Sequence, residues 1–242
     1  FLELGLGGPE ERGALPTDAR NGLGFHGGAI LSRCGLDRPA VVRLELDGTH
    51  WYGPGSPEPR VGGRLAVLAT VGDVVVVAPH LESHGGPRGR ARQVADLLDL
   101  VEGYAEGRPV VVGGDLNTHT LDLSGEEATD GQEATTIGVF DDERFVRPFA
   151  HEPLFAEAAA RGYGWEDANG DEPTHRTVDR GGPVRGKLNL DWFLTRGLAA
   201  SRPEVVPVLA ADGTALSDHD VIVVEVTSLR SAPPASPMRR VP

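Results

Sequence analysis

Apolar and polar positions alternate along the chain in patterns that predict both strands and helices. Residues 64–71 and 74–80 are rich in β-branched side chains and flank Gly72-Asp73, which favours a hairpin. The second of these stretches is apolar on both faces, as expected for a strand buried between two layers. Further strands are expected at residues 41–46 and 49–52 around an Asp47-Gly48 turn, and at residues 110–112, 188–195, 204–209 and 221–226.

Two segments carry the apolar spacing of amphipathic helices. In the first, Leu97, Leu98 and Val101 fall on one stripe and Gly107 follows as a stop. The second lies around residues 151–161. Strands that alternate with helices predict an α/β (α+β) fold in which helices flank mixed sheets.

The rest of the chain is expected at the surface. Residues 118–142 are polar, acidic and without a regular pattern, which indicates a long surface excursion. Residues 228–242 hold four prolines and three arginines among small residues, so a disordered tail is expected there. We therefore predict one domain over residues 1–227, followed by this tail.

Composition narrows the class of protein. Of the 242 residues, 39% are hydrophobic and 24% are charged, the balance of a globular domain with a sizeable core. No apolar run approaches the about 20 residues that a membrane helix requires. A cytoplasmic monomer is expected, although secretion stays open because the chain starts at Phe1 rather than at a methionine.

The charge balance disfavours nucleic acid as a partner. Lys and Arg number 23 against 36 Asp and Glu, a formal net charge of -13 that repels polyanions. The one local basic group, Arg88, Arg90 and Arg92, alternates at the start of a helix and does not share a face. The lone cysteine, Cys34, excludes an internal disulfide framework and is expected to be a small buried residue.

Polar clusters follow the predicted strands at residues 79–82, 113–117, 188–192 and 216–219. Strand ends carry function because a rigid sheet holds the side chains while loops leave them open. Together the clusters offer carboxylates, carboxamide and imidazoles, and oxygen donors suit Mg²⁺ or Mn²⁺. Asp191, inside an apolar stretch, needs a histidine or a metal nearby because burial of an unpaired carboxylate is costly. The set points to phosphoryl transfer to water.

Six motifs occur in one order: Ala29 to Arg33, His80 to Ser83, Arg90 to Gln93, Gly114 to Asn117, Leu190 to Phe193 and Ser217 to His219. At these residues the chain resembles the endonuclease/exonuclease/phosphatase superfamily, which includes apurinic endonucleases, pancreatic-type deoxyribonucleases and neutral sphingomyelinases. The resemblance runs from about residue 24 to residue 226. It implies a four-layer sandwich of two mixed β-sheets flanked by helices, with the site at one end.

The resemblance also implies roles for single residues. Asp115 would orient or deprotonate the attacking water, and Asn117 would hold that water or the phosphate. His219 would bind the scissile phosphate, with Asp191 as its carboxylate partner. Asp218, together with Asp115, would bind the metal.

Three further positions follow from the same resemblance. His80 matches a phosphate-contacting His or Tyr, and Arg33 would lie near the phosphate or form a structural salt bridge instead. Members of the superfamily open with a strand, a helix and a second strand that carry an Asn and the principal metal-ligand Glu. Neither motif is visible here, and Glu3 is a weak substitute. We therefore expect this chain to lack the N-terminal strand-helix-strand.

The sequence thus predicts a Mg²⁺- or Mn²⁺-dependent hydrolase of phosphate esters, acting on a small or lipid-linked substrate. Two alternatives stay open. One is a DNA or RNA endonuclease of the same superfamily, and the other is a truncated, catalytically inert phosphate-binding module.

Overall fold

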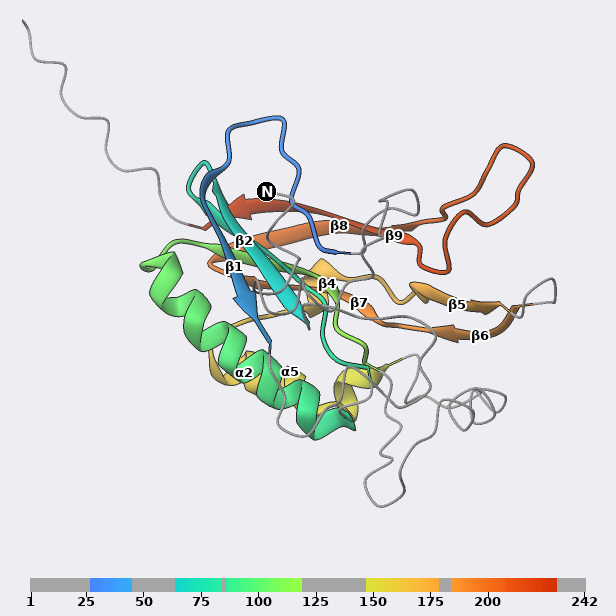
Figure 1. The fold of residues 1–242 in the computed structure, drawn as a ribbon, viewed down its shortest axis with the longest axis horizontal. Coiled ribbons are helices and arrows are strands. Elements are labelled where there is room, and N and C mark those ends of the chain that lie inside the picture. The colour runs from blue at the N-terminus through green and yellow to red at the C-terminus, as the bar shows by residue number, and fades with distance from the viewer. Residues whose placement is uncertain (1–26, 45–63, 84–85, 119–146, 179–183, 230–242) are drawn as a thin grey trace, which may run out of the picture.

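The computed structural model describes residues 27–44, 64–83, 86–118, 147–178 and 184–229. Its central element is a five-stranded sheet with the strand order β1-β2-β3-β4-β7 (Figure 1). The strands are β1 (Asp37–Arg43), β2 (Leu65–Val71), β3 (Val74–Pro79), β4 (Val110–Asp115) and β7 (Asp191–Arg196). β3 and β4 run parallel and the other neighbours antiparallel, so the sheet is mixed.

Two smaller sheets and two helices complete the described part of the chain. β5 (His175–Val178) pairs with β6 (Val184–Leu188), and β8 (Leu198–Val206) pairs with β9 (Val221–Ser228). The helices α2 (Gly86–Ala105) and α5 (Pro153–Ala160) lie together on one side of the large sheet, and β8 and β9 lie on the other (Figure 1). Single 3-10 turns occur at η2 (Pro148–Ala150) and η3 (Glu166–Ala168). This arrangement confirms the predicted α/β sandwich class.

The apolar patterns and turn residues in the sequence predicted most strands and helices at the right place. The hairpin of β2 and β3 closes at Val71 opposite Val74, and Gly72 takes a positive φ of 62° in its turn. The expected strand at residues 41–46 begins earlier, at Asp37, and pairs with β2. Its expected hairpin partner at residues 49–52 lies outside the described residues.

Two predicted strands have different bounds in the structure. The stretch 188–195 is divided, because β6 ends at Leu188 and β7 begins at Asp191. The strand expected at 204–209 is the end of the longer β8. Most of the surface excursion and of the tail lies outside the described residues, as does Glu3.

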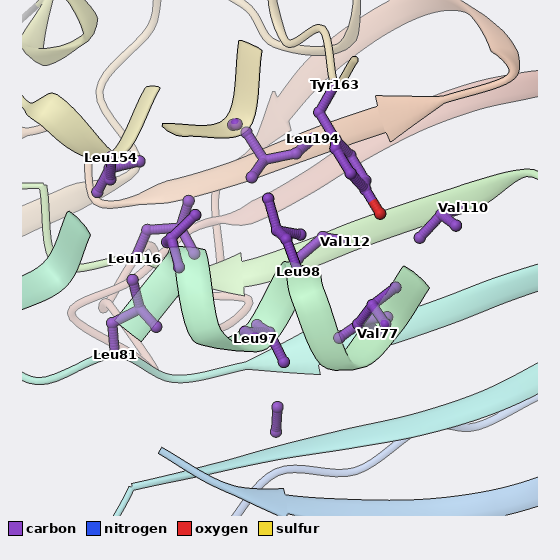
Figure 2. Close-up of a cluster of buried hydrophobic side chains, with 14 of the residues drawn as sticks. Val77, Leu81, Leu97, Leu98, Val110, Val112, Leu116, Leu154, Tyr163 and Leu194 are labelled. Carbon is purple, nitrogen blue, oxygen red and sulfur yellow. The ribbon is translucent and has the colours of Figure 1, made fainter. Parts of the chain in front are cut away.

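The core lies between the large sheet and the two helices. Leu97, Leu98 and Val101 of α2 are at most 1% exposed and belong to one cluster with the valines of β3 and β4 (Figure 2). From α5, Phe155 contacts Trp192 of β7 edge to face, with ring centroids 4.9 Å apart. Because each such side chain contributes about 1.5–3 kcal/mol when buried, this core fixes the sheet that carries the site.

The glycine pair before Asp115 is required by close packing around β4. A Cβ atom on Gly114 would lie 2.2 Å from the carbonyl oxygen of Pro79. One on Gly113 would lie 2.5 Å from the ring of Phe193. The two glycines therefore let β3 and β7 approach the end of β4, where the polar clusters meet.

Replacing Gly114 with alanine is expected to destabilise the protein by about 1–3 kcal/mol, because backbone must move to admit the methyl group. Gly103 is the matched control, since it is an exposed position of α2 with no atom within 4 Å of the added Cβ. Gly103→Ala is expected to stabilise the helix by about 0.5–1 kcal/mol. Thermal unfolding of both variants measures the difference, and equal melting temperatures would contradict it.

A buried ion pair joins the helices to the segment after β3. Arg90 and Glu152 have fully buried side chains, with Nη2 of Arg90 2.5 Å from Oε1 of Glu152. Arg90 also donates to the carbonyl oxygen of Ser83 at 3.3 Å. Gln93 accepts a hydrogen bond from the amide of Glu82 at 2.8 Å. Arg90 is therefore an internal anchor and not part of a basic surface group.

The lone cysteine lies on the surface. Cys34 is exposed, so the expectation that it is buried is wrong. It precedes β1, where residues 31–39 are all exposed and offer no cover. Among the described residues, no helix has both the length and the apolar character needed to cross a membrane.

Candidate active site

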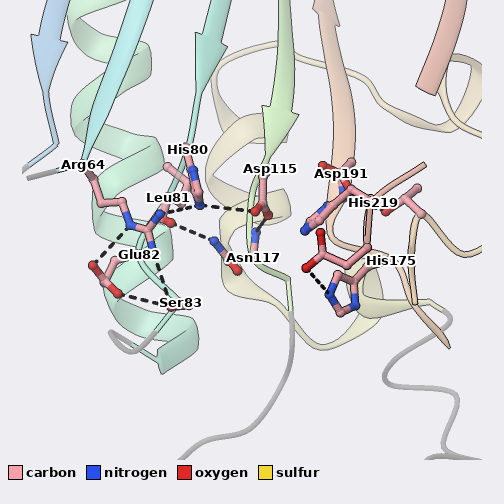
Figure 3. Close-up of polar contacts among 12 residues, drawn as sticks. Arg64, His80, Leu81, Glu82, Ser83, Asp115, Asn117, His175, Asp191 and His219 are labelled. Atoms are coloured by element: carbon pink, nitrogen blue, oxygen red, sulfur yellow. Dashed lines mark hydrogen bonds and ion pairs between the residues drawn. The ribbon is translucent and has the colours of Figure 1, made fainter. Parts of the chain in front are cut away.

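Polar side chains gather at one end of the large sheet, where β4 ends and β7 begins (Figure 3). Asp115 is the last residue of β4 and pairs in register with Asp191, the first residue of β7. His80, directly after β3, forms a parallel bridge with Asp115. Positions far apart in sequence thus meet because parallel strands end at the same edge and an antiparallel strand starts there.

Asp191 and His219 form a hydrogen-bonded pair. Nδ1 of His219 lies 2.8 Å from Oδ2 of Asp191. The hydroxyl of Thr174 donates to the same oxygen at 2.7 Å and accepts from the amide of Asp191 at 3.0 Å. The carboxylate inside an apolar strand is therefore satisfied by an imidazole and a hydroxyl.

His219 is a cation at neutral pH. Burial lowers the pKa of its imidazole, but the hydrogen bond and charge of Asp191, with the charges of Asp115 and Asp218, outweigh this effect. Together they raise the pKa of His219 to about 9. A protonated imidazole at the mouth of the site is suited to hold an anionic oxygen.

The carboxyl group of Asp115 has a pKa that is raised toward neutral pH. Burial and the charge of Asp191 raise the pKa of Asp115 to about 6, against the opposing effects of His219, the Asn117 amide and Arg64. The amide of Asn117 donates to Oδ1 of Asp115 at 2.9 Å. A carboxylate with a pKa in this range can accept a proton from water near neutral pH.

Asn117 is fixed beside this carboxyl group. Its backbone has a positive φ of 49°, which asparagine tolerates better than most residues. Its side-chain amide donates to the carbonyl oxygen of Leu81 at 2.8 Å, and the side chain is buried. The amide nitrogen is thus engaged by the backbone, while Oδ1 keeps its capacity to accept.

His80 contacts the site from the other neighbouring strand. Its Nε2 lies 3.3 Å from Oδ2 of Asp115 and also contacts Nη1 of Arg64. The guanidinium of Arg64 is held by the buried Glu82 at 3.3 Å and by Ser83 at 3.4 Å. Nε2 of His80 thus lies between a guanidinium, which can only donate a hydrogen bond, and the carboxylate of Asp115, which accepts one when ionised.

Sequence reasoning missed three residues here: Arg64, Thr174 and His175. The ring of His175 packs edge to face on that of His219 with centroids 4.7 Å apart, and its Nε2 lies 3.8 Å from Oδ2 of Asp218. Burial and the charge of His219 lower the pKa of His175. The other clusters were found because polar residues follow predicted apolar strands. None of these three residues follows such a strand.

Arg33 lies apart from these residues, and Asp218 lies at their exposed edge. Arg33 is exposed before β1, and none of the hydrogen bonds or ion pairs found among the described residues links it to the site. Asp218 is 69% exposed beside His175, whereas Asp115 and Asp191 are largely buried.

Two groups of side chains could hold a metal ion, and both include His219. The first is Asp115, Asp191 and His219, and the second is His175, Asp218 and His219. In each group the potential ligand atoms lie within 4.8 Å of one another. Burial and the charge of Asp191 raise the pKa of Asp115, and a divalent cation held by the two carboxylates would offset their mutual repulsion. The donors present therefore fit such a cation.

Comparison with known proteins gives one family. Residues 2–219 match the family model described as Endonuclease/Exonuclease/phosphatase family. No curated protein matches the sequence.

Several solved structures are similar at low identity. The endonuclease/exonuclease/phosphatase from Bacteroides vulgatus is 15% identical with a TM-score of 0.49, covering 80% of this chain and 66% of that one. The endonuclease/exonuclease/phosphatase from Beutenbergia cavernae DSM 12333 is 20% identical with a TM-score of 0.49, covering 81% and 46%. The human Nocturnin catalytic domain with bound sulfate anion is 15% identical with a TM-score of 0.48, covering 80% and 59%. This chain therefore spans between 46% and 66% of the lengths of these three structures.

Proposed function

The chain belongs to the endonuclease/exonuclease/phosphatase family, and we propose that it hydrolyses phosphate esters with the help of Mg²⁺ or Mn²⁺. The observation that carries this proposal is the arrangement of Asp115, Asp191 and His219 at the sheet end. A carboxyl group with a pKa near neutrality lies close to a protonated imidazole, and a second carboxylate holds that imidazole in place. Asp115 thus provides a base, and the imidazolium of His219 provides a positive charge, for one phosphate group.

The proposed mechanism is an in-line attack of water on phosphorus. Asp115 accepts the proton of the attacking water, and Asn117 helps to position that water through its Oδ1 acceptor. His219 holds a non-bridging phosphate oxygen, and Asp191 with Thr174 fixes the orientation of its ring. As the new oxygen-phosphorus bond forms, the bond to the leaving alkoxide breaks and the alkoxide takes up a proton from solvent water.

Further residues support these groups. His80 contacts the phosphate from the β3 side, oriented by Arg64. Asp115 is a proposed ligand of the divalent cation, together with the neighbouring Asp191, whereas Asp218 falls in a separate group with His175 and His219. When bound, that cation neutralises phosphate charge and lowers the barrier to attack.

A small or lipid-linked ester is the preferred substrate class. The net charge of -13 repels a long polyanion, and Arg90, the central member of the run Arg88, Arg90 and Arg92, is buried in its pair with Glu152. Neither fact opposes binding of a single phosphate group.

A hydrolysis assay tests the proposal. Bis(p-nitrophenyl) phosphate and p-nitrophenyl phosphate would be offered to the EDTA-treated protein, with and without added Mg²⁺ or Mn²⁺, alongside supercoiled plasmid at low salt. We expect metal-dependent release of nitrophenol that exceeds plasmid nicking. Nicking without release from either ester would favour the endonuclease, and no turnover of any substrate would favour the inert phosphate-binding module.

A further inference from the structure

His175 and His219 are held side by side by the backbone. His175 is the first residue of β5 and forms an antiparallel bridge with His219, which precedes β9. The two rings lie 4.7 Å apart at an interplanar angle of 71°. Asp218 neighbours His219 in sequence, and its carboxylate lies next to the ring of His175. The backbone bridge thus sets the two imidazoles side by side, and the carboxylate of Asp218 lies next to them.

The spacing of these groups is that of ligands around one ion. Nε2 of His175 and Oδ2 of Asp218 are 3.8 Å apart, which is too long for a hydrogen bond. Two ligands that each lie about 2.0–2.2 Å from a zinc ion are separated by roughly 3–4 Å. One potential ligand atom from each of His175, Asp218 and His219 lies within 4.8 Å of the others.

His219 is already oriented as a metal-ligating histidine would be. Its Nδ1 bonds to Asp191, and Thr174 bonds to the same carboxylate oxygen. A carboxylate on one ring nitrogen fixes the tautomer and makes the other nitrogen a better ligand. Nε2 of His219 is therefore the nitrogen prepared to bind a cation.

From this geometry we infer that His175, Asp218 and His219 form a binding site for a divalent transition-metal ion of the zinc type. Two imidazole nitrogens and one carboxylate oxygen are the donors of zinc sites with three protein ligands. Mg²⁺ selects oxygen donors and does not favour two nitrogens. Zinc sites with three protein ligands also keep a fourth coordination position open to water. Asp218 is largely exposed, so solvent can reach that position.

This inference does not depend on hydrolysis by the protein. A zinc-type ion at Nε2 of His219 would place positive charge beside the proposed phosphate position. The inference concerns binding, and it is tested without any substrate.

The test is a titration of the full chain, free of an affinity tag and treated with EDTA, in a phosphate-free buffer. Zn²⁺ binding would be followed by calorimetry in the presence of millimolar Mg²⁺, and Co²⁺ binding by visible absorption. A mildly alkaline buffer is used because the ion must displace the proton of His219. We expect one ion per chain that Mg²⁺ does not displace.

Variants identify the ligands. His175→Gln and Asp218→Asn are each expected to weaken Zn²⁺ binding by at least about tenfold and to change the Co²⁺ spectrum. His151→Ala is the matched control, since His151 is an exposed histidine at the end of η2 and is in neither metal group, and its affinity should equal that of the parent. Asp218→Asn alters an exposed side chain and tests the site even where His175→Gln fails to fold.

Two outcomes would overturn the inference. One is the absence of Zn²⁺ binding in millimolar Mg²⁺, and the other is an affinity that neither His175→Gln nor Asp218→Asn reduces. Zinc binding without any phosphoesterase activity would contradict the proposed function and leave this site intact.

Discussion

Replacing Asp115 with asparagine is expected to lower kcat by about 10²- to 10⁴-fold, the usual contribution of a positioned general base. Asparagine keeps the volume and the acceptor for the Asn117 amide but cannot take a proton. Steady-state hydrolysis of a nitrophenyl phosphate ester at saturating metal measures this effect.

Stability separates loss of chemistry from loss of fold. The pKa of Asp115 is raised because its charge is buried beside Asp191, so ionised Asp115 opposes folding above about pH 6. Removing the charge should leave the melting temperature at neutral pH equal or higher. Asp73→Asn, in the exposed turn between β2 and β3, is the control and should change neither kcat nor stability. A kcat for Asp115→Asn within a few-fold of the parent would refute the role of Asp115 as base.

Glu152→Ala is expected to cost about 3–5 kcal/mol of folding free energy, because it leaves the buried Arg90 without its carboxylate. Burial raises the pKa of Glu152 even though Arg90 opposes the rise, which shows how strongly this pair is desolvated. Urea denaturation would measure the loss as a lower midpoint.

An exposed ion pair provides the comparison. Glu225 of β9 pairs with Arg202 at 2.9 Å, and both side chains are at least 60% exposed. Glu225→Ala should therefore change stability by no more than about 1 kcal/mol. Similar midpoints for Glu152→Ala and Glu225→Ala would show that the buried pair is not an anchor. We also expect Glu152→Ala to reduce activity, since Arg90 holds the segment that follows His80.

The elements that the sequence predicted best are those with a strong local signal. The stripe of α2 and the β-branched strands around Gly72 need no distant partner to be recognised. The meeting of Asp115 with His80 is a finding of the structure: the helix between β3 and β4 lets these strands run parallel, and the two residues bridge where the strands end. Structure that depends only on residues close in sequence could therefore be inferred.

What depended on distant partners could not be inferred. β5 is short and carries no apolar alternation, so Thr174 and His175 gave no sign that they reach Asp191 and Asp218. Counting charges also gave no sign that Arg90 is buried, because its partner Glu152 lies 62 residues away. These contacts are set by tertiary packing, which no local pattern records.

The direct pairing of Asp115 with Asp191 bears on how such a protein can diversify. The two carboxylates face each other through the hydrogen-bond ladder of β4 and β7, and a slip of one residue would turn one of them to the opposite face of the sheet. The ladder, and not the length of the intervening chain, thus sets their separation. An insertion or deletion between the two strands would therefore change what surrounds the reacting groups and leave the distance between them the same.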